Sequence, residues 1–430
     1  MNLRQMIDMA GAILDYAPGI TTYENEVKRF LNESYLDLYA DRAWNFAQKS
    51  TLLSVKADRT ATNGTITGAA AVGIAAGTFF TSDMAGMIIE ISGATNSADN
   101  GEYEILAVDT TATTSAVLVT MNGNTPTLSG AGTGTFKVKQ RYVDLPPDTI
   151  EVLSLGIRSP ENERQEWVYL NRWLDEHLAL DIDLVSRPTD WIIYDEYVMP
   201  QPRVTPTLSL VLGASTSPVA GVYDVCYTFI RQNRESAPSP ISGTVTVANA
   251  AADTINAGSL QVTTGAALLK RTYFRCPLSN RFYRAEAVDV VPADVGTGGV
   301  SFQNITTFIV NSEPLPEHEG RYKRLRPYPR QDKDYEATLR YVYRPPRLLD
   351  DSDVPEFPAD FHRYLVYRTC QELFVKHNNL PQSEMYKIKS EDELMRMQQR
   401  CLTQSANTWI KSSFRQSAIY RRPRPRLTHN

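Results

Sequence analysis

Long apolar runs are missing from this chain of 430 residues. No stretch approaches the roughly 18 to 20 apolar residues that a membrane-spanning helix needs, and the blandest run, residues 69–80, is interrupted by Gly73 and Gly77. Arg4 and Asp8 fall in an amphipathic pattern and leave no apolar core for a signal peptide. We therefore expect a chain that makes no membrane contact.

Cysteine is scarce, with four residues that form no C-x-x-C pair and have no histidine at metal-ligand spacing. Free buried thiols in a reducing compartment are expected. Asp350, Asp351 and Asp353 could hold a hard cation, but they lack the glycine and the distal glutamate of a calcium loop. A solvated turn is the favoured interpretation, and we expect no metal and no cofactor.

Catalytic motifs are missing as well. The chain has no G-x-S-x-G elbow, no G-x-x-x-x-G-K-[ST] loop and no H-E-x-x-H pair. The glycine cluster at residues 296–299 lies between predicted strands, where a turn explains it, because no helix follows to bind phosphate. A non-enzymatic protein without catalytic residues is therefore expected, with a cytoplasmic enzyme carrying β accessory domains as an alternative.

Positive charge does not dominate, since the net charge is -5, whereas a dedicated nucleic-acid binder has a basic surface. Residues 321–347 are nevertheless locally basic and interleave arginines with tyrosines. These residue types are frequent in interface hot spots and also suit phosphate contact and base stacking. A protein interface is favoured, with intramolecular pairing and DNA contact as alternatives. The candidate interface residues of this segment are Arg324, Arg326, Tyr328 and Arg330.

A second basic segment, residues 411–430, has six positive side chains and no carboxylate. Pro423 and Pro425 preclude a regular helix there. We expect this arm to be disordered alone and to order when it docks on a partner, with a solubilising tail as the alternative. Its candidate interface residues are Arg415, Tyr420, Arg421, Arg422, Arg424 and Arg426.

Helical patterns occupy both ends of the chain. The first turns carry an apolar stripe at i, i+3, i+4 and i+7 spacing, formed by Leu3, Met6, Ile7 and Ala10. Thr21 and Glu24 predict a capping box for a helix that runs to about residue 48, with Trp44 and Phe46 as buried anchors. After Pro358, two more helices are predicted, the first capped by Asp360 and the second by Ser383.

The middle of the chain has β patterns. Residues 57–134 are rich in small and polar residues, and the Asn100-Gly101 and Asn122-Gly123 turns predict hairpins of a small antiparallel barrel or sandwich. Strand patterns across residues 208–310 have the spacing of an immunoglobulin or fibronectin type III sandwich. One helix is expected between these regions, near residues 171–180.

Neither helical end can bury its apolar stripe alone. We therefore predict an α+β fold, in which a discontinuous helical frame at both chain ends is interrupted by two antiparallel β-domains. The expected parts are the frame at residues 1–56, 136–202 and 319–410, the barrel-like insert at 57–135, the immunoglobulin/fibronectin-like sandwich at 203–318, and the basic C-terminal arm at 411–430.

Three short tracts resemble a known family. The tracts at residues 42–46 (RAWNF), 142–148 (YVDLPPD) and 355–362 (PEFPADFH) are similar, in the same order, to tracts of the head-to-tail adaptors of short-tailed bacteriophages, also called tail-tubular A-like or tail accessory proteins. The β-regions also resemble modules of phage structural proteins. Residues 99–105 resemble small β-barrels, and residues 227–229, 235–240 and 271–275 resemble fibronectin-like modules.

The resemblance implies a structural protein of the virion, located at the head-tail junction and assembled in the host cytoplasm. Its expected partners are the portal protein, a tail nozzle or tail tube protein, and further copies of itself in a homo-oligomeric ring of about twelve subunits. DNA would pass transiently through the channel during genome ejection. A tail-hub or baseplate protein with a glycan-contacting β-domain is the alternative.

Overall fold

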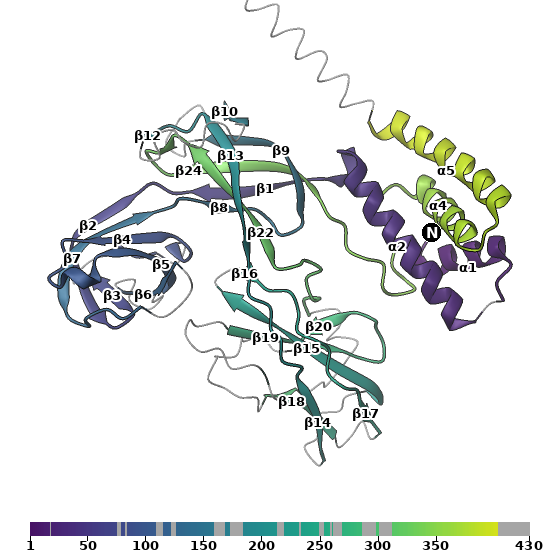
Figure 1. Cartoon of the computed structure of the whole chain (residues 1–430), viewed down its shortest axis with the longest axis horizontal. Coiled ribbons are helices and arrows are strands. Elements are labelled where there is room, and N and C mark those ends of the chain that lie inside the picture. The colour runs from purple at the N-terminus through teal and green to yellow at the C-terminus, as the bar shows by residue number, and fades with distance from the viewer. Residues whose placement is uncertain are drawn as a thin grey trace, which may run out of the picture. The chain divides into compact units, whose positions relative to one another are not determined.

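The computed structural model divides the chain into two compact units (Figure 1). Met1–Lys49 and the chain from Tyr341 onward form unit 1, and Ser50–Arg340 form unit 2. The described residues are 1–402 apart from 18, 75–78, 82–83, 109–114, 122–125, 159–167, 173–183, 213–218, 232–233, 249–252, 259, 261–268, 286–297 and 301–311.

Unit 1 is helical and combines both ends of the chain. Helices α1 (Leu3–Leu14) and α2 (Thr21–Asp41) come from its N-terminal part, and α4 (His362–Lys376) and α5 (Leu380–Cys401) from its C-terminal part. Helix α4 packs against the other three, so the apolar stripe of each end is buried by the other end. The predicted stripe of α1 is confirmed, because all four of its residues are buried.

Helix α2 is shorter than predicted. It ends at Asp41, and Arg42 is already extended. The indole nitrogen of Trp44 donates a 2.7 Å hydrogen bond to the carbonyl of Leu38 and takes up a carbonyl of the last turn. A short 3-10 helix, η1 (Asn45–Ala47), then leads into strand β1 (Gln48–Val55).

The three predicted side-chain caps of α2, α4 and α5 are wrong. Ile20 precedes α2 without a side-chain cap, because the Glu24 carboxylate instead accepts from the backbone of Gly19 and pairs with Arg4. Asp360 falls inside the 3-10 helix η5 (Ala359–Phe361), so no side chain caps α4. Asn379 caps α5, whereas the Ser383 hydroxyl donates to the Gln371 carbonyl. In each case a tertiary contact or an earlier start replaces the local motif.

Unit 2 contains a closed antiparallel barrel with the strand order β2-β3-β6-β5-β4-β7 (Figure 1). Its core includes Ile89, Ile105 and Phe136. Gly64 is required there, since a β-carbon at this position would lie 2.3 Å from the Phe136 ring. The strands are β2 (Arg59–Gly68), β3 (Ala71–Ile74), β4 (Ile88–Ser92), β5 (Gly101–Val108), β6 (Ser115–Thr120) and β7 (Gly132–Lys139).

Short sheets connect the barrel to the rest of unit 2. One has the order β1-β24-β9-β10 and another the order β11-β13-β22-β8, while β12 pairs with β23. Their strands are β8 (Val143–Asp144), β9 (Thr149–Arg158), β10 (Val168–Tyr169), β11 (Asn171–Arg172), β12 (Val185–Ser186), β13 (Asp190–Val198), β22 (Arg321–Tyr328), β23 (Arg330–Gln331) and β24 (Tyr335–Tyr343).

The prediction of a helix near residues 171–180 is wrong for its first two residues. Asn171 and Arg172 form strand β11, which pairs in parallel with Asp190 and Trp191 of β13. The backbone of Asn171 also donates to the carbonyl of Thr189. Sheet pairing with a distant strand therefore overrides the local helical pattern. Residues 173–180 lie outside the described part of the chain.

Two further sheets form the second β-domain of unit 2. One has the order β14-β18-β21, and the other the order β16-β15-β19-β20 with β17 beside β15. Tyr223, Ile255 and Phe274 from both sheets share one core. The strands are β14 (Thr207–Leu212), β15 (Gly221–Arg231), β16 (Arg234–Glu235), β17 (Val245–Val247), β18 (Asp253–Gly258), β19 (Leu269–Arg275), β20 (Phe282–Arg284) and β21 (Gly298–Val300). The expected α+β fold, with helices near both ends and antiparallel β-structure between them, is confirmed.

Candidate functional site

A cluster of buried charge in the described part of unit 2 surrounds Arg324, one of the predicted interface residues. Its side chain is only 16% exposed and lies 3.5 Å from Asp195 and 4.0 Å from Asp144. The guanidinium also lies over the rings of Tyr197 and Tyr142, at 4.6 and 5.2 Å from the ring centroids. Strand β22 thus directs Arg324 into the protein, where it is paired within the chain.

Two arginines of the second β-domain reach the same place. Arg234 of β16 donates to Asp144 at 2.7 Å and to Glu104 of the barrel strand β5 at 3.3 Å. Arg231 of β15 donates to the other oxygen of Glu104 at 2.6 Å and to the Tyr197 hydroxyl at 3.2 Å. One barrel carboxylate, 8% exposed, is therefore bound by two guanidinium groups of another domain.

We call this cluster the ionic junction. Burial opposes the charge of Arg234, but the carboxylates of Asp144 and Glu104 outweigh it and raise the pKa of Arg234 above its ordinary value. The guanidinium of Arg234 also lies 4.5 Å from the centroid of the Tyr197 ring. Ion pairing offsets the cost of burying these charges, although Asp144 Oδ1, Arg231 Nε and Arg324 Nε are buried without a hydrogen-bond partner among the described residues. The members of the junction are Glu104, Asp144, Asp195, Tyr197, Arg231, Arg234 and Arg324.

A second buried carboxylate, Glu235, adjoins the ionic junction. It accepts from the Thr228 hydroxyl at 2.6 Å and from the Tyr273 hydroxyl at 2.5 Å, and Arg271 lies 3.3 Å away. Its backbone N–H donates to the Tyr322 hydroxyl at 2.6 Å. Burial raises the pKa of Tyr322 to about 12, so this phenol stays protonated. These contacts tie strand β22 to the second β-domain.

The remaining predicted residues lie apart from the ionic junction. Arg330 of β23 pairs with Asp58 at 3.0 Å, and its side chain is largely buried. Arg326 and Tyr328 are partly buried on β22. All six candidates of the C-terminal arm lie outside the described residues. Arg324 and Arg330 therefore have partners within the chain. These contacts correspond to intramolecular pairing, one of the three interpretations of this segment.

Sequence reasoning missed most of the ionic junction. Arg231 ends β15 and Arg234 begins β16, and charged residues are common at strand ends. Glu104 alternates with apolar residues of β5, as a surface residue does. The sequence pointed to one member of the junction, Asp144, because this residue lies inside the tract at residues 142–148. The partners of that carboxylate come from distant segments, and no spacing rule identifies them.

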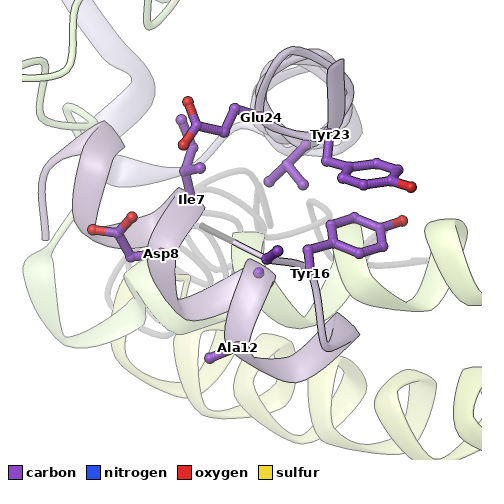
Figure 2. Close-up of a pocket in the computed structure, with 9 residues that line it drawn as sticks. Ile7, Asp8, Ala12, Tyr16, Tyr23 and Glu24 are labelled. Carbon is purple, nitrogen blue, oxygen red and sulfur yellow. The ribbon is translucent and has the colours of Figure 1, made fainter. Parts of the chain in front are cut away.

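Unit 1 has a groove of about 270 Å³ between α1 and α2 (Figure 2). The rings of Tyr16 and Tyr23 are stacked in it with centroids 4.3 Å apart. The Tyr16 hydroxyl lies 2.8 Å from His377 Nε2, in hydrogen-bond contact. The lining residues are Ile7, Asp8, Gly11, Ala12, Tyr16, Ala17, Tyr23, Glu24 and Val27.

Carboxylates border this largely apolar groove. Asp8 and Glu24 carry them, and Arg4 bridges the two at 3.0 and 2.9 Å. The hydrogen bond from Arg4 lowers the pKa of Glu24 below its ordinary value, so the carboxylate stays ionised. The border of the groove has a net negative charge, because the two carboxylates outnumber the single guanidinium of Arg4.

The tracts at residues 42–46 and 355–362 meet inside unit 1. Trp44 is fully buried and stacks on Phe46 at 5.6 Å between centroids, and Phe357 lies 5.9 Å from the Phe46 ring. His362 contacts the Phe357 ring, and its Nε2 lies 3.0 Å from the Phe357 carbonyl oxygen. Burial lowers the pKa of His362, so the imidazole is neutral at pH 7. These residues form one aromatic cluster with Tyr35, Tyr39 and Tyr343.

Metal ligands are not clustered in the described part of the chain. Among these residues, no group of three or more histidine, cysteine, aspartate or glutamate side chains is arranged to hold a metal ion. None of the described helices is long and apolar enough to cross a membrane. In comparisons with known proteins, no family model, no curated protein and no solved structure matches the chain.

Proposed function

We propose that the protein is a structural head-to-tail adaptor of a short-tailed bacteriophage virion. In this role, copies form a ring that joins the portal to the tail nozzle or tail tube and surrounds a channel for the genome. The protein is then a virion component of the head-tail junction and acts without turnover or cofactor. Its partners are the portal protein, the tail protein and other copies of itself.

The observation that carries the proposal is the contact between two of the tracts that resemble the adaptor family. Residues 42–46 and 355–362 lie at opposite ends of the sequence, yet Phe46 and Phe357 pack in one aromatic cluster. Motifs that matched by chance would have no reason to share a core. Their convergence supports the view that they belong to one framework of the adaptor type.

The third tract supports the proposal from unit 2. Strand β8 of residues 142–148 pairs with β22, and its Asp144 binds Arg234 at 2.7 Å. The ionic junction thereby connects the barrel, a central sheet and the second β-domain through buried, directional contacts. A subunit that transmits force or holds a channel needs domains that keep their relative positions. Buried guanidinium–carboxylate bonds provide such fixed geometry.

Coexpression with the portal protein of the same genome tests the proposal. The expected result is a complex whose native mass and cryo-EM projections show a ring of about twelve copies on the portal. A trimer or hexamer that binds glycans and ignores the portal would favour the tail-hub alternative. A monomer with hydrolytic activity would favour the enzyme.

A further inference from the structure

We infer that residues 409–411, where the basic C-terminal arm begins, dock in a pocket of unit 1 in the same chain. The pocket lies between α2 and α4, at the opposite end of α2 from the groove of Figure 2. The inference concerns the chain by itself and does not depend on the adaptor role.

The pocket has a volume of about 480 Å³, which falls in the range of about 300–1,000 Å³ that binding pockets span. The second half of α2 forms one wall, and α4 and α5 contribute Tyr364 and Leu394. Leu38 and Ala40 of α2 also line it, so part of the wall is apolar. Such a lining suits an occupant that combines apolar side chains with one charge.

Asp37 supplies the uncompensated charge of this pocket. Arg42 pairs with Asp41 at 2.9 Å. Arg368 pairs with Glu372 at 3.1 Å. The exposed Asp37 makes no ion pair with any described residue. Burial raises the pKa of Glu372, and the Asp37 carboxylate raises it further against the opposing charge of Arg368. The pocket therefore has a net negative charge, which favours a cationic occupant.

A buried hydroxyl in the pocket lacks a partner. Ser34 lines the pocket and is only 3% exposed, and its Oγ makes no hydrogen bond with a described residue. A buried polar group without a partner lowers stability. An occupant whose backbone N–H donated to this oxygen would remove that cost, which is an observation in favour of a ligand independent of the charge.

The end of α5 lies beside the same pocket. With its side-chain oxygen turned toward Arg42, the Gln398 amide accepts from two guanidinium nitrogens at 3.0 and 3.2 Å. The described residues end at Leu402, about one helical turn later. From there, the distance back along α5 to Leu394 is about 12 Å. The nine residues 403–411 span about 17 Å as a random coil, so Lys411 reaches the pocket.

The residues at this distance match the pocket in chemistry. Trp409 and Ile410 are the first large apolar residues after Leu402, and Lys411 is the first cation. No carboxylate occurs in residues 403–430 to compete for that ammonium group. The two apolar side chains suit the wall of Leu38, and the ammonium group suits Asp37.

Tethering favours the same chain over other occupants. A short flexible linker gives an effective concentration in the millimolar range, so a contact with a dissociation constant of about 1 mM is occupied at least half of the time. A second copy at micromolar concentration would leave so weak a site almost empty. The occupant is therefore a segment of this chain, which holds the start of the arm against unit 1.

The test measures the rate at which chymotrypsin cleaves the full chain after Trp409, followed by mass spectrometry. Asp37→Lys is expected to raise this rate about three- to fivefold, because cleavage follows the population of released segment. A lysine toward the end of α2 is compatible with the helix dipole, so the helices are expected to stay folded by circular dichroism. Glu151→Lys reverses an exposed charge of unit 2 and is the matched control, expected to be cleaved as the wild type is.

A charge swap tests the pairing itself. Lys411→Glu alone is expected to release the segment, since its carboxylate would face Asp37. The double variant Asp37→Lys with Lys411→Glu restores an attractive pair and should return the cleavage rate to near that of the wild type. A variant that had only loosened the helices would not be rescued by a second substitution in the arm.

Three outcomes would overturn the inference. Cleavage that is unchanged by both Asp37→Lys and Lys411→Glu would show that the segment does not dock there. Protection that rises with protein concentration would assign the occupant to a second copy. Unchanged cleavage of Asp37→Lys together with weakened binding to immobilised portal would assign the pocket to the portal. None of these results bears on ring formation, so the proposed function is tested separately.

Discussion

The rings of Phe46 and Phe357 lie 5.9 Å apart between centroids, although all of unit 2 separates them along the chain. The first precedes β1 and the second precedes α4, so their contact joins the two ends of the sequence in one core. Burial of aromatic surface is the dominant favourable term available to a small helical unit. Unit 1 therefore depends on aromatic contacts between segments that are distant in sequence.

Trp44→Ala is expected to destabilise unit 1 by about 3–5 kcal/mol, as truncation of a large core aromatic does. The fully buried indole also donates to Leu38, so the variant leaves that carbonyl unpaired. Chemical denaturation measures the change, and Tyr169→Ala, at an exposed aromatic of unit 2, is the control. A stable Trp44→Ala variant that failed only in assembly would show that Trp44 is an interface residue.

The sequence predicted the parts of unit 1 that local periodicity determines. The stripe of Leu3 and Met6 and the burial of Trp44 follow from residue type and spacing. The end of α2 does not, because it depends on the Trp44 indole reaching the Leu38 carbonyl. The ion-pair partners of Arg324 could not be predicted from the sequence either, because Asp144 and Asp195 come from other strands. Sequence periodicity reports one face of an element and carries no information on which distant element meets it.

Removal of one partner from the ionic junction is expected to be costly. Arg234→Ala leaves Glu104 and Asp144 with fewer donors in a buried site, and breaking a buried pair typically costs about 3–5 kcal/mol. Denaturant unfolding of the full chain measures this change. Arg321→Ala removes an exposed pair with Glu196 and is expected to have little effect. Equal stability of the two variants would show that the junction is hydrated and weak.

Deletion of residues 57–134 with a short linker is expected to leave unit 1 folded, because none of its helices lies in that range. The deletion also removes Glu104, so Arg231 and Arg234 lose a carboxylate in unit 2. A second deletion variant that also carries Arg231→Met should regain part of the lost stability, since apolar replacement of a buried ion is often favourable. Loss of cooperative unfolding of the helices, followed by circular dichroism, would contradict the prediction.

Acid is expected to destabilise unit 2 through His318. Burial lowers its pKa from an ordinary 6.5 to about 4, so between these values the unfolded state binds a proton that the folded state does not. Stability therefore rises with pH across this window and is fully present above about pH 6.5. His318→Gln should flatten that part of a stability-pH profile measured by urea unfolding. A profile that is unchanged by the substitution would show that another group titrates.

Truncation after Ile410 is expected to weaken portal binding without affecting the fold. The residues removed carry six positive side chains and no carboxylate, so they can form charge-assisted bonds to acidic groups of a partner. Ordering such an arm costs conformational entropy, which an extended complementary surface has to offset.

Titration of the full chain and the truncated chain against immobilised portal measures the difference. Binding of the full chain is expected to fall as salt is raised from about 0.1 M toward 1 M, because screening shortens the reach of surface charges. The truncated chain should bind weakly at all salt concentrations. Replacement of the arm's arginines by lysines keeps the charge but removes the bidentate geometry, so intermediate binding is expected if paired bonds form. Undiminished binding by the truncated chain would leave the arm as a solubilising tail.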